Sequence, residues 1–203
     1  NKYPKVVLAA LRRLEANIMK VEFSVSNSKH SPHRRLTAPL GEDSSQMSFP
    51  EFKIDTETNL NPRYTLSSFI VGKSNEMSYA AASAIIEDIG RKYNPLFIYG
   101  GTGLGKTHLM QAVGNEIKEK YKNKVKVKYV SSEKFTNDVI WAIRNKRMDT
   151  MKEKYRLVDV LIIDDIQFII GKPTTEEEFF NTFNALYEGN KQIIISADRP
   201  PKF

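Results

Sequence analysis

The sequence predicts an α/β fold built around a parallel β-sheet. From residue 61 onward, short apolar runs alternate with segments whose apolar residues recur at helical spacing, which is typical of strands joined by crossover helices. One run, 158–163, is apolar at nearly every position, as expected for a strand that helices cover on both faces. A second run, 96–99, leads through the glycine-rich stretch GGTGLGKTH into another helical segment. This strand–loop–helix order is the third sign of a parallel α/β sheet.

The segments before this region differ from it in composition. Residues 1–26 hold one amphipathic helix and one alternating strand, too little for a core, so we interpret them as the end of a small α+β domain whose beginning is missing. Residues 27–60 are rich in Ser, Pro, Thr and His and poor in apolar anchors, which favours a flexible linker. The sequence therefore predicts an N-terminal remnant over 1–26, a linker over 27–60 and an α/β domain over 61–203.

The elements of the α/β domain follow from periodicity and from the residues at their ends. Lysines alternate with apolar residues along 124–130, which suits an edge strand whose lysines discourage pairing with other chains. Thr175 and Glu178 have the spacing of a capping box that opens a helix, and Gly189 closes this helix. We expect helices over about 75–89, from 106, over 133–155 and from 175, and strands over 96–99, 124–130, 158–163 and 192–196.

Composition narrows the classes of function. The chain of 203 residues has no cysteine, which excludes disulfides and thiolate metal sites and fits a reducing, cytoplasmic location. No window approaches the roughly 18–20 apolar residues that a membrane span needs, and no secretory signal opens the chain. The net charge of +7 favours polyanionic partners such as nucleic acid, although a surplus of this size is also common on solvated surfaces.

The stretch GGTGLGKTH matches the phosphate-loop pattern G-x-x-x-x-G-K-[ST] between a predicted strand and a predicted helix. The glycines let backbone N–H groups turn toward phosphate oxygens, and the helix N-terminus adds its dipole. We expect Lys106 to reach the β- and γ-phosphates and the Thr107 hydroxyl to bind Mg²⁺. The candidate ATP-binding residues of the loop are Gly101, Thr102, Gly103, Leu104, Gly105, Lys106 and Thr107.

Two carboxylates, Asp164 and Asp165, end the apolar run 158–163 and would lie beside the loop at the carboxyl edge of the sheet. We expect Asp164 to hold Mg²⁺ through water and Asp165 to orient or deprotonate the attacking water. Glutamate is the usual residue at the second position, so the shorter Asp165 predicts slow hydrolysis. The last strand leads to Asp198, which we interpret as a sensor of the γ-phosphate or, alternatively, as a cap of the turn that follows.

Several segments closely resemble the family of bacterial chromosomal replication initiators, DnaA, which are AAA+ ATPases. The resemblance extends over residues 61–202 and is specific, because NPLFIYGG and IDDIQF are not shared by phosphate-loop ATPases in general. The segments that carry it are NPRYT (61–65), YNPLFIYGG (93–101), SEKFTN (132–137), LIIDDIQF (161–168) and EFFNTFNAL (178–186).

The resemblance implies a protein that binds ATP or ADP with Mg²⁺, self-assembles on origin DNA and promotes duplex opening, with ATP as the assembly switch. It implies contacts to the replicative helicase or to regulators through the N-terminal domain. It also places the adenine beside the segment before the first helix, so Ile70 and Val71 are candidates for the adenine pocket, unless they pack this helix onto the sheet. In this family a pair of inserted helices contacts single-stranded DNA, which here makes Lys134 and Ile140 candidates, with Lys172 in the loop after the paired aspartates.

The family's arginine finger, fifth strand, lid and helix-turn-helix do not match any part of residues 1–203, so we expect an incomplete AAA+ core. The strand order that the resemblance implies, 5-1-4-3-2, leaves strand 96–99 at an open edge and predicts a poorly stable, weak ATPase. The first alternative is a DnaA-like regulator or a helicase-loader ATPase that lacks the helix-turn-helix. The second alternative is a nucleotide-dependent binding module without hydrolysis.

Overall fold

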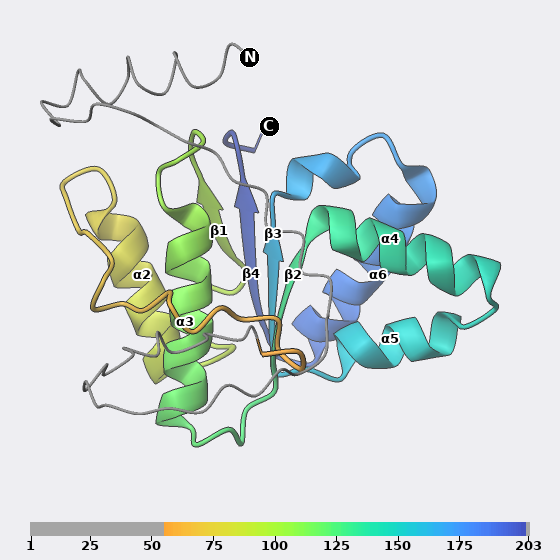
Figure 1. Cartoon of the computed structure of the whole chain (residues 1–203), viewed down its shortest axis with the longest axis horizontal. Coiled ribbons are helices and arrows are strands. Elements are labelled where there is room, and N and C mark those ends of the chain that lie inside the picture. The colour runs from red at the N-terminus through yellow and green to blue at the C-terminus, as the bar shows by residue number, and fades with distance from the viewer. Residues whose placement is uncertain (1–54, 202–203) are drawn as a thin grey trace, which may run out of the picture. The chain divides into compact units, whose positions relative to one another are not determined.

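The computed structural model describes residues 55–201, which form a parallel four-stranded sheet with helices on both faces (Figure 1). The strand order is β1-β4-β3-β2 and every neighbouring pair is parallel, which confirms the predicted α/β class and the predicted order of these four strands. The predicted N-terminal remnant and the linker up to residue 54 lie outside the described residues.

The helices form two layers, one on each side of the sheet. Helices α2 and α3 cover one face, and α4, α5 and α6 cover the other (Figure 1). The strands are β1 (Leu96–Tyr99), β2 (Val127–Ser131), β3 (Val160–Asp164) and β4 (Gln192–Ala197). The helices are α2 (Glu76–Glu87), α3 (Lys106–Lys120), α4 (Ser132–Arg144), α5 (Met148–Arg156), the 3-10 helix η1 (Ile166–Ile169) and α6 (Pro173–Glu188).

The central strands β3 and β4 are buried at every position, as their apolar sequences predict. In their parallel register, Ile162 lies beside Ile194, and Ile163 beside Ile195. Ile162 belongs to the hydrophobic cluster under α2 and α3, whereas Ile163 belongs to the cluster under α4, α5 and α6. The alternation of side chains along one strand therefore supplies both cores.

The segment 55–69, which we call the strap, packs against the domain before the first helix begins. The predicted linker was drawn to Leu60, but the Leu60 side chain is only 1% exposed and Thr58 is also buried. The backbone N–H of Tyr129 donates to the Thr58 carbonyl at 2.8 Å, and the Asn59 side-chain amide donates to the Tyr129 carbonyl at 3.1 Å. The packed part of the domain therefore begins before residue 61.

The strap also changes the interpretation of β2. This strand pairs with β3 alone within the sheet, as predicted for an edge strand, but the strap covers part of its outer edge. The sequence predicted that Lys128 is exposed and discourages pairing of the edge strand with other chains. It is instead buried, and its Nζ donates to the Glu57 carbonyl. Burial lowers the pKa of the Lys128 ammonium.

Helix α6 begins earlier than the sequence predicted, and the predicted capping box of Thr175 and Glu178 is wrong. The helix starts at Pro173, a residue whose fixed φ and missing N–H suit the first helical position. Thr175 and Glu178 are both buried inside the helix, and the carboxylate that reaches back is Glu176, which accepts from the Gly171 N–H at 2.7 Å. Within residues 55–201, none of the helices is both long enough and apolar enough to cross a membrane.

Candidate nucleotide-binding site

The loop between β1 and α3 has the backbone that the phosphate-loop pattern requires. Gly103 and Gly105 have positive φ angles of 81° and 86°, a conformation that residues other than glycine rarely adopt. A Cβ added to Gly105 would lie 3.2 Å from the Phe69 ring, whereas one added to Gly103 would meet nothing within 4 Å. The loop is therefore closed on the side of the strap and open on the side of Gly103.

Helix α3 begins at Lys106, so its first unpaired N–H groups point into the loop. The Lys106 ammonium folds back over the loop and donates to the carbonyls of Gly100 and Gly101 at 2.8 Å and 2.9 Å. These bonds hold a positive charge at the place where a bound anion would need it. The predicted contribution of Lys106 to phosphate binding is consistent with this position.

The carboxylate of Asp164, at the end of β3, is the centre of a buried polar cluster. Its Oδ2 accepts hydrogen bonds from the hydroxyls of Thr107 at 2.7 Å and Tyr129 at 2.9 Å. Its Oδ1 accepts from the hydroxyl of Ser196, on β4. The Ser132 hydroxyl donates to the Asp164 carbonyl at 2.8 Å. Four elements therefore orient this residue, and the sequence had named Thr107 alone among its partners.

Two of these partners have properties that suit a fixed hydrogen-bond donor. Burial and the neighbouring Asp164 carboxylate raise the pKa of the Tyr129 hydroxyl well above its ordinary value, so this group stays protonated and donates. The Ser196 side chain is fully buried, and its oxygen also accepts from the backbone N–H of Asp165 at 2.8 Å. Ser196 thus connects both aspartates to β4.

Asp165 follows directly in the left-handed region, with φ of 56°, a conformation that Asp tolerates better than most residues. Asp165 lines the same hollow as Lys106 and Thr107 of the loop. The Gln167 side-chain amide donates to the Asp165 carboxylate at 3.2 Å.

Seven of the predicted nucleotide-site residues line one hollow of about 460 Å³, whereas Gly101, Leu104 and Asp164 are not among its lining residues. Asp165 and Asp198 lie at its wall together with Lys106 and other residues of the phosphate loop. The Asp198 carboxylate also accepts from the side chain of the neighbouring Arg199 at 3.2 Å, an ion pair that does not cap the backbone of the turn. The lining residues are Tyr64, Thr102, Gly103, Gly105, Lys106, Thr107, His108, Asp165, Gln167, Phe168 and Asp198.

The donor set fits the metal that the sequence predicts. Mg²⁺ prefers oxygen ligands and takes few of them from the protein when phosphates are present. The Thr107 hydroxyl and the Asp164 carboxylate are such ligands, and they lie in direct contact beside the loop. Among residues 55–201 no group of three or more His, Cys, Asp or Glu side chains could hold a metal by itself, so phosphate and water would have to complete the site.

The two candidates for the adenine pocket, Ile70 and Val71, do not line a hollow as the phosphate-site residues do. Ile70 is 87% exposed, Val71 is also exposed, and neither lines a hollow beside the loop. A second hollow, of about 200 Å³, lies between the end of the strap, α2, β1 and the loop. Its wall includes Phe69 and Asn75, and the Asn75 side-chain amide donates to the Ile70 carbonyl at 3.0 Å. Sequence reasoning missed Phe69, although it adjoins the two residues that were named.

The DNA candidates are all exposed and come from neighbouring elements. Ile140 and Lys134 lie on α4, and Lys172 precedes α6, which packs against α4. Trp141, the residue after Ile140, is 56% exposed and therefore does not anchor the core. The Lys134 ammonium pairs with Asp138 at 2.8 Å, which reduces the charge available there.

The strand, loop and helix, with paired aspartates at the carboxyl edge of a parallel sheet, define the class as a phosphate-loop nucleotide-binding domain. A family model, the bacterial DnaA ATPase domain, matches residues 60–203. The chain therefore belongs to the bacterial DnaA ATPase family, which confirms the resemblance drawn from the sequence.

Curated relatives and solved structures agree with this membership. A chromosomal replication initiator protein DnaA of Thermus thermophilus is 60% identical over 70% of this chain and 33% of the relative. The DnaA protein of Deinococcus radiodurans is 47% identical over 98% of this chain and 45% of the relative. The chain thus spans less than half the length of these relatives.

A solved structure of the replication initiator DnaA bound to AMPPCP and single-stranded DNA is 44% identical, with a TM-score of 0.66 over 69% of this chain and 43% of that chain. The DnaC helicase loader shares the fold alone, at 17% identity and a TM-score of 0.57 over 69% of this chain and 79% of that chain. The comparisons therefore do not favour the loader alternative.

Proposed function

We propose that this chain is the nucleotide-binding part of a chromosomal replication initiator, in which bound ATP switches assembly on origin DNA. One observation carries the proposal. The Thr107 hydroxyl and the Asp164 carboxylate are in contact at the mouth of the phosphate loop, while Asp165 and Asp198 line the same hollow as Lys106. A triphosphate in this hollow would meet a cation, a metal-binding pair and two further carboxylates.

In this proposal the loop N–H groups and Lys106 hold the β- and γ-phosphates. Thr107 and Asp164 hold Mg²⁺, which neutralises charge that develops on the phosphate oxygens when it is bound. Asp165 orients or deprotonates the attacking water, and Asp198 senses the γ-phosphate. Because Asp165 is short and is also bonded by Gln167, we expect hydrolysis to be slow and to act as a reset of the switch.

The base would occupy the second hollow, of about 200 Å³. Phe69 offers an apolar wall there, and the main chain of Ile70 and Val71 passes next to it along the sequence. The position of these two exposed residues favours contacts through their backbone over contacts through their side chains.

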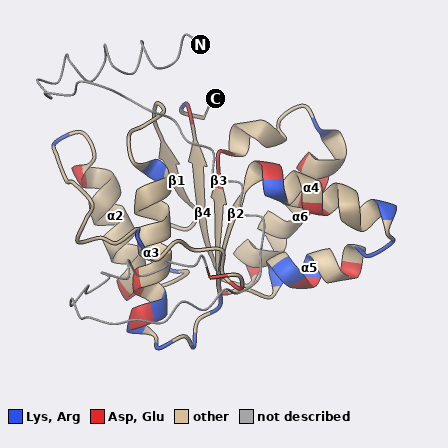
Figure 2. Ribbon diagram, in the orientation of Figure 1, with Lys and Arg blue, Asp and Glu red and all other residues tan. Residues whose placement is uncertain are grey.

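The pair α4 and α5 is our candidate surface for single-stranded DNA. Three of its basic side chains are neutralised by neighbours: Lys134 and Lys154 pair with Asp138, and Arg156 pairs with Glu178. Figure 2 shows further Lys and Arg at the turn between the two helices, where Arg144, Lys146 and Arg147 are exposed. Arg144 lies one helical turn beyond the exposed Ile140, so charge and apolar surface adjoin there.

The wider activity is inferred from the relatives. Self-assembly, duplex opening and contacts with the replicative helicase or regulators belong to proteins of which this chain spans less than half. We propose that this chain supplies the ATP-dependent step of that activity.

Nucleotide titration tests the proposed site. Fluorescent ATP should bind in the presence of Mg²⁺, and Lys106→Ala should weaken binding by about a hundredfold, since a direct charge–phosphate contact is lost. Lys120→Ala, at the other end of α3, is the matched control and should bind like the unchanged chain. Equal binding by Lys106→Ala and the unchanged chain would refute the site.

Hydrolysis distinguishes the ATPase from the alternative binding module. Asp165→Asn should keep ATP binding within about twofold and slow phosphate release by about a hundredfold, which is in the range for removing a general base. If the two chains release phosphate at the same measurable rate, Asp165 has no part in hydrolysis. If neither chain releases phosphate above the background rate while both bind ATP, the binding module becomes the better description.

DNA binding is tested with a labelled single-stranded oligonucleotide at several salt concentrations. Arg144→Gln should reduce the salt dependence of binding by about one counterion, and Ile140→Ala should lower affinity severalfold at every salt concentration. Lys120→Gln serves as the control. Unchanged binding by both α4 variants would exclude this surface.

A further inference from the structure

Four polar side chains form a stripe along α3, the helix that starts at the phosphate loop. The stripe consists of His108, Gln111, Asn115 and Lys118, spaced by three, four and three residues, so they share one helical face. Each of the four bonds to the strap, 55–69, rather than to another helix. This regularity indicates that the strap has one set position along the helix.

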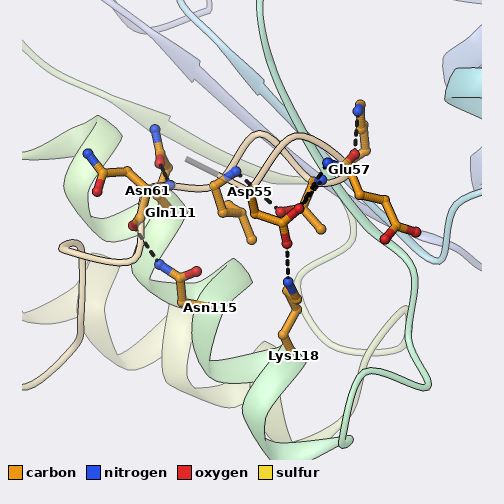
Figure 3. Close-up of polar contacts among 9 residues, drawn as sticks. Asp55, Glu57, Asn61, Gln111, Asn115 and Lys118 are labelled. Carbon is orange, nitrogen blue, oxygen red and sulfur yellow. Dashed lines mark hydrogen bonds and ion pairs between the residues drawn. The ribbon is translucent and has the colours of Figure 1, made fainter. Parts of the chain in front are cut away.

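The middle of the stripe holds the main chain of the strap (Figure 3). The Gln111 side-chain oxygen accepts from the Asn61 N–H at 2.8 Å. The Asn115 side-chain amide donates to the Asn61 carbonyl at 2.9 Å, as Figure 3 shows, and to the Tyr64 carbonyl, also at 2.9 Å. Because these bonds reach backbone atoms, they fix the path of the strap independently of its side chains.

The stripe reaches the phosphate loop at His108, the residue after Thr107. The His108 Nε2 lies 3.0 Å from the Thr65 carbonyl oxygen. Its ring lies between two aromatic rings of the strap, with centroids 5.0 Å from Tyr64 and 5.4 Å from Phe69. The strap is therefore tied to α3 within one residue of the predicted metal-binding hydroxyl.

The strap ends at the wall of the second hollow. The Phe69 ring lies against Gly105 of the loop and lines the hollow of about 200 Å³. It also stacks on the Tyr79 ring of α2, with 6.1 Å between the two ring centroids. A shift of the strap along α3 would move Phe69 relative to Gly105 and would widen or close this hollow. The distance between the loop and the Phe69 wall would thus depend on the bonds of Gln111 and Asn115, which lie about two and three helical turns along α3 from Gly105.

We propose that Gln111 and Asn115 are positioning residues for the base of the nucleotide: they hold the strap so that Phe69 stands at the correct distance from the phosphate loop. This inference rests on the proposed nucleotide site. Neither residue lines either hollow beside the loop, so Asn115 acts through the strap. Gln111 bonds to the strap and also to the Tyr129 hydroxyl of β2, which makes Asn115→Ala the primary test. Because Phe69 forms a wall of the second hollow, whereas Tyr64 is the strap residue among those that line the phosphate hollow, a displaced strap should weaken binding of the base more than binding of the phosphates.

The test compares the affinities of the full chain for two ligands, ATP and inorganic tripolyphosphate. Each ligand is titrated into the chain in the presence of Mg²⁺. Asn115→Ala removes the donor to two strap carbonyls and should weaken ATP by about tenfold, the loss expected when hydrogen bonds no longer hold one wall of a pocket. Tripolyphosphate, which has no base, should bind within about twofold of its original affinity. A role in stability alone would not change the ratio of the two affinities.

A control and a second variant guard against misfolding. Lys118→Ala breaks the ion pair with Asp55 at the far end of the strap and should leave the ratio unchanged. Gln111→Leu keeps a side chain of similar size at a buried position, loses the acceptor for the Asn61 N–H, and should shift the ratio in the same direction as Asn115→Ala.

The outcomes separate this inference from the function on which it rests. If the unchanged chain binds ATP and tripolyphosphate but neither variant changes the ratio, the positioning role is wrong and the nucleotide site stands. If both ligands weaken equally in the two variants, the stripe acts on the whole domain and the inference is again overturned. If the unchanged chain binds neither ligand, the proposed site fails and the inference fails with it.

Discussion

Replacing Leu60 tests directly whether the strap is part of the domain. The Leu60 side chain is 1% exposed, and it packs onto α3 at Gly114. A Cβ added to Gly114 would lie 2.9 Å from the Leu60 Cδ2 and 3.0 Å from the Ile162 Cδ1, so there is no free space between the strap, α3 and β3. Leu60→Ala should therefore leave a cavity in the core under α2 and α3.

The expected cost of Leu60→Ala is about 3 kcal/mol of unfolding free energy, within the roughly 2–5 kcal/mol of buried Leu→Ala changes. Gly114→Ala has two opposing effects. The crowded Cβ costs about 1–3 kcal/mol, while alanine gains about 1 kcal/mol of helix propensity over glycine. We expect a net loss of about 1 kcal/mol for Gly114→Ala alone.

The double variant Leu60→Ala/Gly114→Ala should be more stable than the sum predicts, because the new methyl occupies space that the leucine vacates. A favourable coupling of about 1–2 kcal/mol is expected for side chains in contact. Urea unfolding of the chain, followed by circular dichroism, measures all four species. Leu157→Ala, at an exposed position, is the control and should change stability by less than about 0.5 kcal/mol.

Two results would refute this reasoning. A change below about 0.5 kcal/mol for Leu60→Ala would mean that residue 60 belongs to a flexible linker, as the sequence first suggested. Simple additivity in the double variant would mean that Leu60 and Gly114 are not neighbours.

Three further changes test other parts of the structure. Ser196→Ala removes a hydroxyl that donates to Asp164, so the Mg²⁺ concentration needed for half-maximal ATP binding should rise by about tenfold; an unchanged requirement would contradict this role. Lys118 lowers the pKa of Asp55 from 3.8 to about 2, so this pair stabilises the fold above pH 4 and loses that effect as the pH falls from 4 to 2. Lys118→Met should reduce this loss of unfolding free energy between pH 4 and pH 2 by less than about 1 kcal/mol. Urea titrations that show the same loss in both chains would contradict it. Gly90→Ala should destabilise the chain by about 3 kcal/mol or more, because φ at this position is 79° and the new Cβ would lie 2.1 Å from the Asn190 carbonyl oxygen, in the turn before β4. A melting temperature equal to that of the unchanged chain would contradict this prediction.

The sequence by itself determined the class of the fold and the chemical core of the site. Apolar runs and helical periodicity are local patterns, so they predicted the four strands and the parallel sheet with small errors at their ends. The phosphate loop and the pair Asp164 and Asp165 were equally visible, because their chemistry needs specific residues at short spacing along the chain. Lys106, Thr107, Asp165 and Asp198 indeed line one hollow.

Only the tertiary structure decided which residues from distant segments support that core. Ser196 and Tyr129 come from other strands than Asp164, and no local pattern along either strand identifies them as its partners. The strap shows the same limit more strongly. Its first residues, 55–60, were predicted as linker from their composition, but they pack on the domain. The side chains of Gln111 and Asn115 bond the backbone of the strap, and backbone hydrogen bonding leaves little trace in the sequence of the segment that is held.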